Sequence, residues 1–305
     1  MRTRGSVRPS GRVTSARESA QATRAINRKF ADDSRSSSVL TKTRDRYVTI
    51  GRLAALEQSL SDRDRQILAT LASVRVATAK QLYRLHFDGV TRRQARAVLV
   101  SLADRRLICR LPRVVGGARS GSTGFVYSLD VAGTRLMRPD RSRPQRPWSI
   151  GLRFLNHSLA ISEVYVQLVL TERAGRLGLA DFTTEPGCWR TFSGPGGGRL
   201  VLKPDAAIRL VLGQYEDRWF LEADLATESR TALARKCDLY QRYWQAGLEQ
   251  SQTGVFPKVL WLLPDEARYA VVIDVIGRLP AESWPLFAVA LMSEAVERLL
   301  QGAAK

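Results

Sequence analysis

Three pairs of residues with the spacing of a capping box constrain the fold of this chain more than any other sequence feature. The pairs are Ser61 with Asp64, Thr78 with Gln81, and Thr91 with Gln94. In a capping box the two side chains satisfy free N–H groups at the start of a helix. Apolar residues follow each pair at helical spacing. The sequence therefore predicts three short helices in close succession.

Two strands are expected after these helices. Leu107–Val115 and Phe125–Leu129 have strand patterns, and a Gly/Ser-rich loop, Gly116–Gly124, joins them. This pattern predicts a hairpin with a flexible tip, followed by a short helix that starts near Asp130. Three helices and a hairpin in this order are typical of a winged helix-turn-helix, which we place at residues 59–137.

Residues 149–305 alternate between helical and strand patterns and predict a mixed α/β domain. The expected helices are Asn156–Glu172, Ser229–Ala246 and Pro285–Leu300. The expected strands are Asp181–Glu185, Ala206–Leu212, Arg218–Asp224, Lys258–Leu263 and Ala270–Val275. The run Gly194–Gly198 lacks the Lys-Ser/Thr of a P-loop, so it is expected to be a turn. We therefore expect an α/β protein of two domains.

Two further segments have no helical or strand periodicity. Residues 1–58 are expected to be a basic, largely disordered tail, because the first 38 residues are rich in Arg, Ser, Thr and Gly and poor in apolar residues. Residues 138–148 (RPDRSRPQRPW) are rich in Pro and Arg and predict an extended linker. The charge of the tail suits contact with phosphate groups as well as solvation.

The strongly basic first half of the chain points to a polyanionic partner. The net charge is +19, and residues 148–305 carry 17 Lys and Arg against 18 Asp and Glu, so the whole excess lies in residues 1–147. Such an excess indicates nucleic acid or an anionic membrane. The apolar runs are too short to span a bilayer, and we expect no membrane partner. The three scattered cysteines favour a reducing compartment, and the two histidines are too few for a Cys/His zinc site, so we expect a cytoplasmic protein.

The third predicted helix carries the residues best suited to read DNA. A helical wheel buries its apolar residues and turns Arg93 and Arg96 outward. Arginine offers a bidentate fork to guanine, and glutamine can bridge adenine. The expected contacts with double-stranded DNA are Lys80, Arg84, Thr91, Arg92, Arg93, Gln94 and Arg96, with Arg110, Arg113 and Arg119 on the predicted wing. The alternative is a winged helix that binds protein and has a solvated basic face.

Three carboxylates in the second half are candidates for an acidic cluster. Asp205 follows a proline just before a predicted strand, and Glu222 and Asp224 close another. Because side chains alternate along a strand, Glu222 and Asp224 point to the same face. Together with Asp205 they would suit a hard divalent cation such as Mg²⁺.

Several segments, taken in order, resemble the replication-relaxation family. They are SDRDRQILATLASVRVATAKQLYRLHF, TRRQARAVLVSLADRRLICRL, GFVYSLDVAGTRLM, NHSLAISEVYVQL, KPDAAIRL, FLEADLATES and KCDLYQRYW. The resemblance covers roughly residues 60–265 and rests on motif order rather than on one sharp signature. It implies a protein of plasmids or other mobile elements that acts in replication and DNA relaxation. It also implies a winged helix followed by a domain that resembles the restriction-endonuclease fold.

The resemblance implies roles for the acidic residues. In nucleases of the PD-(D/E)XK type, a Pro-Asp and a later acid hold Mg²⁺, and a lysine two residues on helps to activate the attacking water. Asp205 and Glu222 match the two acids and would be the metal ligands, and Glu163 would be the further acid that the first helix often supplies. The chain departs from the pattern at Asp224, which stands at the lysine position. Lys236, in the next predicted helix, is the candidate that could reach back to the acids and take the role of this lysine.

Three functions follow as hypotheses. The first is a DNA-binding protein of a mobile element that needs no cofactor for binding. Its inactive nuclease-like domain would form a homodimer or dock replication or transfer proteins. The second is a Mg²⁺-dependent nicking or cleaving endonuclease that uses Asp205 and Glu222, and the third is a transcriptional repressor of the element. A relaxase with paired histidine ligands is nearly excluded, and the spacing of Tyr240 and Tyr243 indicates a packing stripe rather than nucleophiles.

Overall fold

The computed structural model describes residues 48–111, 124–138 and 152–302, which belong to one compact unit, Tyr47–Lys305. Most of the predicted tail and of the predicted linker lies outside the described residues, as do Arg113 and Arg119. No helix within the described ranges is both long enough and apolar enough to cross a membrane.

The three predicted capping boxes are all present and start the three predicted helices. At each start the Ser or Thr side chain accepts a hydrogen bond from the third backbone N–H of the helix, and the acid or glutamine at that position bonds back to the capping residue. The helices are α3 (Asp62–Val74), α4 (Ala79–His86) and α5 (Arg92–Asp104). Their apolar faces share a core that includes Ile67, Leu82 and Leu99.

A three-stranded antiparallel sheet accompanies these helices. Its strands are β1 (Val76–Thr78), β2 (Ile108–Arg110) and β3 (Val126–Leu129), in the order β1-β3-β2. The β2–β3 pairing confirms the predicted strand pair, although the end of the predicted first strand and the loop lie outside the described residues. The short β1 was not predicted. Asp130 caps the helix α6 (Val131–Leu136), as expected.

Helix α2 (Ile50–Gln58) corrects the predicted extent of the tail. It lies within residues 1–58, which we expected to be largely disordered, and its N-cap is Thr49. Leu53 and Leu56 are buried and join the core of the first part of the chain. One apolar stripe of two leucines is a weak sequence signal, but it is sufficient here because α6 offers a surface to cover.

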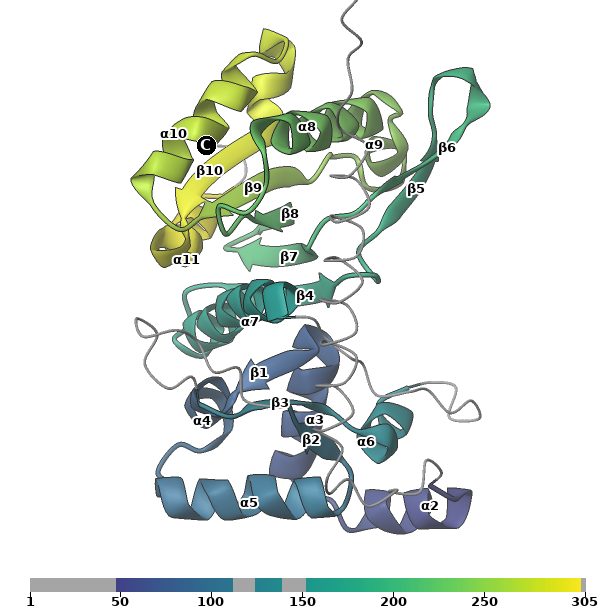
Figure 1. Ribbon diagram of the computed structural model, residues 1–305, viewed down its shortest axis with the longest axis vertical. Coiled ribbons are helices and arrows are strands. Elements are labelled where there is room, and N and C mark those ends of the chain that lie inside the picture. Colours follow the sequence, from purple (N-terminus) through teal and green to yellow (C-terminus); the bar gives the residue numbers. More distant parts are fainter. Residues whose placement is uncertain (1–47, 112–123, 139–151, 303–305) are drawn as a thin grey trace, which may run out of the picture. The chain divides into compact units, whose positions relative to one another are not determined.

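The second part of the chain is built on a five-stranded mixed sheet (Figure 1). Its strands are β4 (Gly178–Thr184), β7 (Ala206–Leu212), β8 (Tyr215–Ala223), β9 (Lys258–Leu263) and β10 (Phe287–Leu291). They lie side by side in chain order, with β7 antiparallel to β4 and β8, and with β8, β9 and β10 mutually parallel. A separate hairpin is formed by β5 (Arg190–Ser193) and β6 (Arg199–Leu202), and the predicted turn Gly194–Gly198 connects its strands.

Helices cover both faces of the five-stranded sheet. On one face lie α7 (Leu152–Arg173) and α11 (Ala295–Leu300), and on the other α8 (Arg230–Gln245) and α10 (Glu266–Gly277), with the short α9 (Leu248–Thr253) after α8 (Figure 1). Two predictions were wrong here. Ala270–Val275 lies in helix α10 rather than in a strand. The predicted helix Pro285–Leu300 spans the end of one 3-10 turn, then β10 and a second 3-10 turn, before α11.

Helix α7 joins the two parts of the chain. The hydroxyl of Ser162 donates to the carbonyl of Val76 in β1 (2.6 Å), and the guanidinium of Arg173 donates to the carbonyl of Leu85 in α4 (2.7 Å). The same helix also packs on the sheet, where the rings of Tyr165 and of Phe182 in β4 lie 5.0 Å apart. No residue from position 157 to position 171 is exposed, because protein covers this helix on both sides.

Candidate functional site

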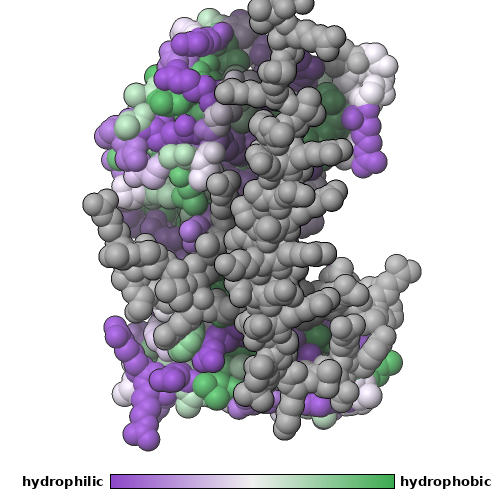
Figure 2. Space-filling view, viewed as in Figure 1, coloured by the Kyte–Doolittle hydropathy of each residue, from purple (hydrophilic) through white to green (hydrophobic). Residues whose placement is uncertain are grey.

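Helix α5 presents its basic residues to solvent as predicted. Ala95, Leu99 and Leu102 are at most 1% exposed, so the helix is anchored by its apolar face. Arg92, Arg93 and Arg96 are exposed on the other side. Figure 2 shows hydrophilic residues gathered at the lower left, at the end of the molecule where α5 begins. The first turn of α5 is therefore both fixed in place and accessible to a large ligand.

The other predicted DNA contacts divide into exposed and engaged side chains. Lys80 and Thr91 are exposed, and Arg110 of β2 is exposed with its guanidinium 4.2 Å from the centre of the Phe125 ring. The side-chain oxygen of Gln94 accepts hydrogen bonds from the backbone N–H and the hydroxyl of Thr91 (3.1 and 2.7 Å). Gln94 therefore acts as part of the cap, and a bidentate contact with adenine would break that cap.

Arg84 and Glu163 contact each other, which places two predicted site residues together. The guanidinium of Arg84 forms an ion pair with Glu163 of α7, and the side-chain amide of Gln81 also donates to Glu163 (3.0 Å). Glu163 thus lies between α4 and α7 and does not join the other acids. Arg84 is held by the same contact, so it is a weaker candidate for phosphate binding than Lys80.

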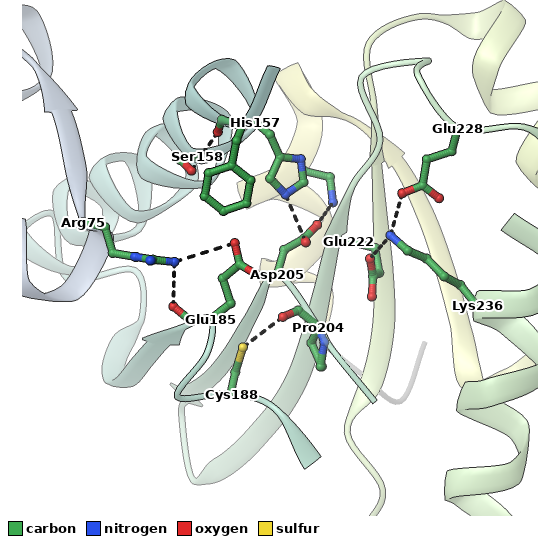
Figure 3. Close-up of polar contacts among 12 residues, drawn as sticks. Arg75, His157, Ser158, Glu185, Cys188, Pro204, Asp205, Glu222, Glu228 and Lys236 are labelled. Carbon is green, nitrogen blue, oxygen red and sulfur yellow. Dashed lines mark hydrogen bonds and ion pairs between the residues drawn. The ribbon is translucent and has the colours of Figure 1, made fainter. Parts of the chain in front are cut away.

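Asp205 lies at the point where α7, β7 and β8 meet (Figure 3). One carboxylate oxygen is 3.0 Å from Nε2 of His157, and the other accepts a hydrogen bond from the backbone N–H of Ala223 (2.8 Å). The backbone of Asp205 also pairs with Leu221 of β8. Asp205 is therefore fixed by both its main chain and its side chain.

Glu222, the second predicted acid, is buried with only 1% of its surface exposed. One of its oxygens accepts a hydrogen bond from Tyr240 (2.6 Å) and the other lies 3.0 Å from Nζ of Lys236. Lys236 also contacts Glu228 at 2.8 Å (Figure 3). The predicted approach of Lys236 from α8 to Glu222 is thus confirmed.

The charged groups around Asp205 and Glu222 shift one another's pKa values. Burial and the neighbouring Asp205 carboxylate raise the pKa of Glu222 to about 8, against the attraction of Lys236. Burial opposes the charged form of His157, but the hydrogen bond and charge of Asp205 outweigh it and raise its pKa. The acids around Lys236 likewise overcome its burial and raise its pKa. Lys236 therefore keeps its charge at neutral pH, whereas burial and Asp205 disfavour the charged form of Glu222.

Asp224 does not join Asp205 and Glu222. Its carboxylate lies 2.5 Å from the guanidinium of Arg268 in α10, and the Asp224 side chain is only 1% exposed. Arg268 also donates to the backbone carbonyl of Glu228 (2.7 Å). The residue at the expected lysine position is thus neutralised by an arginine from another helix.

A second polar contact closes the site on the side of α3. Arg75 follows α3 in a left-handed conformation (φ 69°), and its guanidinium donates to the carbonyl of Glu185 (3.1 Å) and lies 3.7 Å from the Glu185 carboxylate. The cavity that Arg75, Glu185, His157 and Asp205 line holds about 10 Å³. That is room for about one water molecule beside Asp205.

The arrangement does not fit Mg²⁺. All four carboxylate oxygens of Asp205 and Glu222 already contact His157, Ala223, Lys236 or Tyr240. In the part of the chain that the structure describes, no three His, Cys, Asp or Glu side chains are grouped so as to hold a metal ion. Mg²⁺ requires several free oxygen ligands in a near-octahedral arrangement. The residues instead form a closed network of ion pairs and hydrogen bonds.

Two members of this network were missed by the sequence analysis. His157 was not among the predicted site residues, and Tyr240 was interpreted as part of a packing stripe. Tyr240 is indeed fully buried, but its hydroxyl also bonds to Glu222. The spacing of His157 to Ile161 and Val164 was the available signal, because it puts the imidazole on the same side of α7 as two buried apolar residues.

The comparisons with known proteins agree with the motif order found in the sequence. No curated protein and no solved structure matches the chain. The model of one family, described as replication-relaxation, matches residues 68–259, which include α4, α5, the five-stranded sheet up to β8 and the helix that carries Lys236. The match spans more than half of the sequence, and the chain therefore belongs to the replication-relaxation family.

Proposed function

We propose that the protein binds double-stranded DNA through α5, and that it does so in the replication or relaxation of a mobile genetic element. The observation that carries the proposal is the first turn of α5, where Arg92, Arg93 and Arg96 are exposed on a helix whose other face is fully buried. Helices of this kind enter the major groove and meet base edges with their N-terminal residues. The basic charge of the first half supplies the attraction to phosphate.

The neighbouring elements support a winged helix-turn-helix. α4 precedes α5, and the antiparallel strands β2 and β3 follow it, which is the order of helix, recognition helix and wing. Arg110 on β2 and Lys80 on α4 are exposed and would contact the DNA backbone on either side of α5. The five-stranded sheet with helices on both faces is consistent with a restriction-endonuclease-like domain that has lost its chemistry.

The test is the affinity of the full chain for duplex DNA after the double substitution Arg93→Ala and Arg96→Ala. Each bidentate arginine contact contributes about 1–3 kcal/mol, so the variant is expected to bind its preferred site roughly a hundredfold more weakly in fluorescence anisotropy. The matched control is Arg235→Ala with Arg278→Ala, which removes the same charge from α8 and from the residue after α10. Equal affinities of both variants for every duplex tested, at low and at moderate salt, contradict the proposal.

A second candidate function, metal-dependent DNA cleavage, has one observation in its favour. Lys236 reaches Glu222 beside Asp205, which is the trio of residue types that such nucleases use. Against it stand the closed network and the small cavity.

Incubation of the protein with supercoiled plasmid and Mg²⁺ or Mn²⁺ separates the two candidates. We expect the plasmid to be retarded in the gel but not nicked, with the same result in EDTA. Nicking that needs the metal and disappears in Asp205→Asn would instead establish a nuclease with its site at this acid.

A further inference from the structure

The β5–β6 hairpin has an outer face that the proposed function does not use. Side chains alternate along both strands: Phe192 and Leu202 are buried against α8, with the Phe192 and Tyr243 rings 5.1 Å apart. The residues that alternate with these along each strand point to the opposite, outer face. The outer face carries Trp189, Thr191, Ser193, Arg199, Val201 and Lys203, of which Val201 is half-buried and the others exposed. The hairpin stands apart from the five-stranded sheet (Figure 1).

An aromatic ring and a cation lie together at the base of this face. Arg190 pairs with Leu202 across the hairpin, so Trp189 and Lys203 are neighbours just beyond the last pair. Trp189 is 37% exposed, and Nζ of Lys203 is 4.6 Å from the centre of its ring. A large aromatic side chain kept at the surface beside a cation is the combination that single-strand binding proteins use to hold a base and its phosphate.

Charge on the hairpin is of one sign. No Asp or Glu occurs from Pro186 to Pro204, whereas Arg190, Arg199 and Lys203 are all basic. Arg190 is engaged with Glu249 at 2.7 Å, which leaves Arg199 and Lys203 as the exposed cations. Arg199 begins β6 and Lys203 follows its last residue, so the two cations would contact different phosphates of one strand.

The base of the hairpin is fixed to the core of the domain. The thiol of Cys188 donates to the carbonyl of Pro204 (3.0 Å), which ties the residue before Trp189 to the residue after Lys203. Burial raises the pKa of this thiol to about 12, so it remains a neutral donor. The exposed ring is therefore held on an ordered platform.

We propose that the outer face of the β5–β6 hairpin binds single-stranded DNA, with a base stacked on Trp189 and phosphates beside Lys203 and Arg199. A single strand is favoured over a duplex because the faces of paired bases are already stacked on one another and cannot reach a tryptophan ring. The inference rests on the proposed function only in that DNA is the ligand. Its contacts are separate from those of α5.

The experiment measures the affinity of the full chain for a fluorescent oligothymidine and for a duplex of the same length. Trp189→Ala is expected to weaken binding of the oligothymidine about tenfold and to change duplex binding less than twofold. Trp189→Phe, which keeps an aromatic face, should recover most of the loss. The variant Arg93→Ala with Arg96→Ala should show the opposite pattern, with duplex binding weakened and oligothymidine binding retained.

A cross-link gives an independent readout. An oligonucleotide with 5-iododeoxyuridine should cross-link on irradiation to the peptide that contains Trp189. Oligothymidine binding that is unchanged in Trp189→Ala, or weakened equally with duplex binding, overturns the inference. Because the two arms use different ligands and variants, failure of duplex binding through α5 would remove the proposed function without affecting this result.

Discussion

Replacement of Arg268 by alanine is expected to lower the free energy of unfolding by about 3–5 kcal/mol, the usual cost of leaving a buried charge without its partner. The Asp224 side chain is only 1% exposed, and its contact with the Arg268 guanidinium at 2.5 Å supplies its compensating charge. The substitution also removes the hydrogen bond to the Glu228 carbonyl. Urea denaturation followed by circular dichroism measures the change.

Two control variants test whether the loss of stability comes from the ion pair between Arg268 and Asp224. The double substitution Arg268→Ala and Asp224→Ala should recover part of the lost stability, because no buried charge then remains unpaired. Arg278→Ala removes an arginine from the end of the same helix, but its partner Asp274 is 41% exposed, so we expect almost no change. If Arg268→Ala destabilises the protein no more than Arg278→Ala does, the ion pair with Asp224 is not a structural contact.

Glu222→Gln is expected to change how stability depends on pH. The pKa of Glu222 is about 8 in the folded protein and near 4.3 in the unfolded chain, so between these values the unfolded state releases a proton that the folded state keeps. Stability from this group is full below pH 4 and is lost as the pH rises to 8, by about 1.4 kcal/mol per pH unit. Glutamine has no such proton. Relative to the native protein, the free energy of unfolding of the variant should therefore rise by on the order of 5 kcal/mol between pH 4 and 8.

The measurement compares the urea unfolding curves of both proteins at several pH values in this window. Because the charges of Glu222, Asp205 and Lys236 act on one another, the difference reports the titration of this group and not of one isolated carboxyl. A difference in stability that stays constant with pH would contradict a raised pKa at Glu222.

Local signals in the sequence predicted the helix starts well. A capping box needs only residues three apart, so Thr78 with Gln81 and Thr91 with Gln94 determine their own hydrogen bonds without help from the rest of the fold. The strands Ala206–Leu212 and Lys258–Leu263 also have the predicted bounds. Both are short apolar runs between breaking residues, which restricts the alternatives.

Elements that depend on distant partners were the ones predicted wrongly. The run Ala270–Val275 is almost entirely apolar, so it shows neither the helical nor the strand periodicity of apolar residues. A buried helix and a buried strand cannot be distinguished by such a run. The missed signal was Asp265, whose side chain accepts from the backbone N–H of Arg268 and starts α10. Phe287–Leu291 is a strand because β9 lies beside it, a partner that no local pattern reveals.

Two carboxylates of the acidic site were predictable, but most of their partners were not. Asp205 and Glu222 followed from the family motifs and strand alternation, and the structure brings them together with Lys236. Glu163 was expected there because it lies on the first helix of the domain, but α7 contacts protein on two sides and Glu163 faces α4. Which face of a doubly covered helix meets the sheet is decided by packing, and its sequence alone leaves both options open.

That double coverage of α7 has a consequence for the evolution of the protein. Residues of one helix contact both the part that contains α5 and the five-stranded sheet, as Ser162 with Val76 of β1 and Tyr165 with Phe182 of β4 illustrate. Neither part can be exchanged for an unrelated module without leaving an unmatched face on α7. The two parts are therefore expected to be inherited together, with changes on one side of α7 restricting the sequences that the other side can accept.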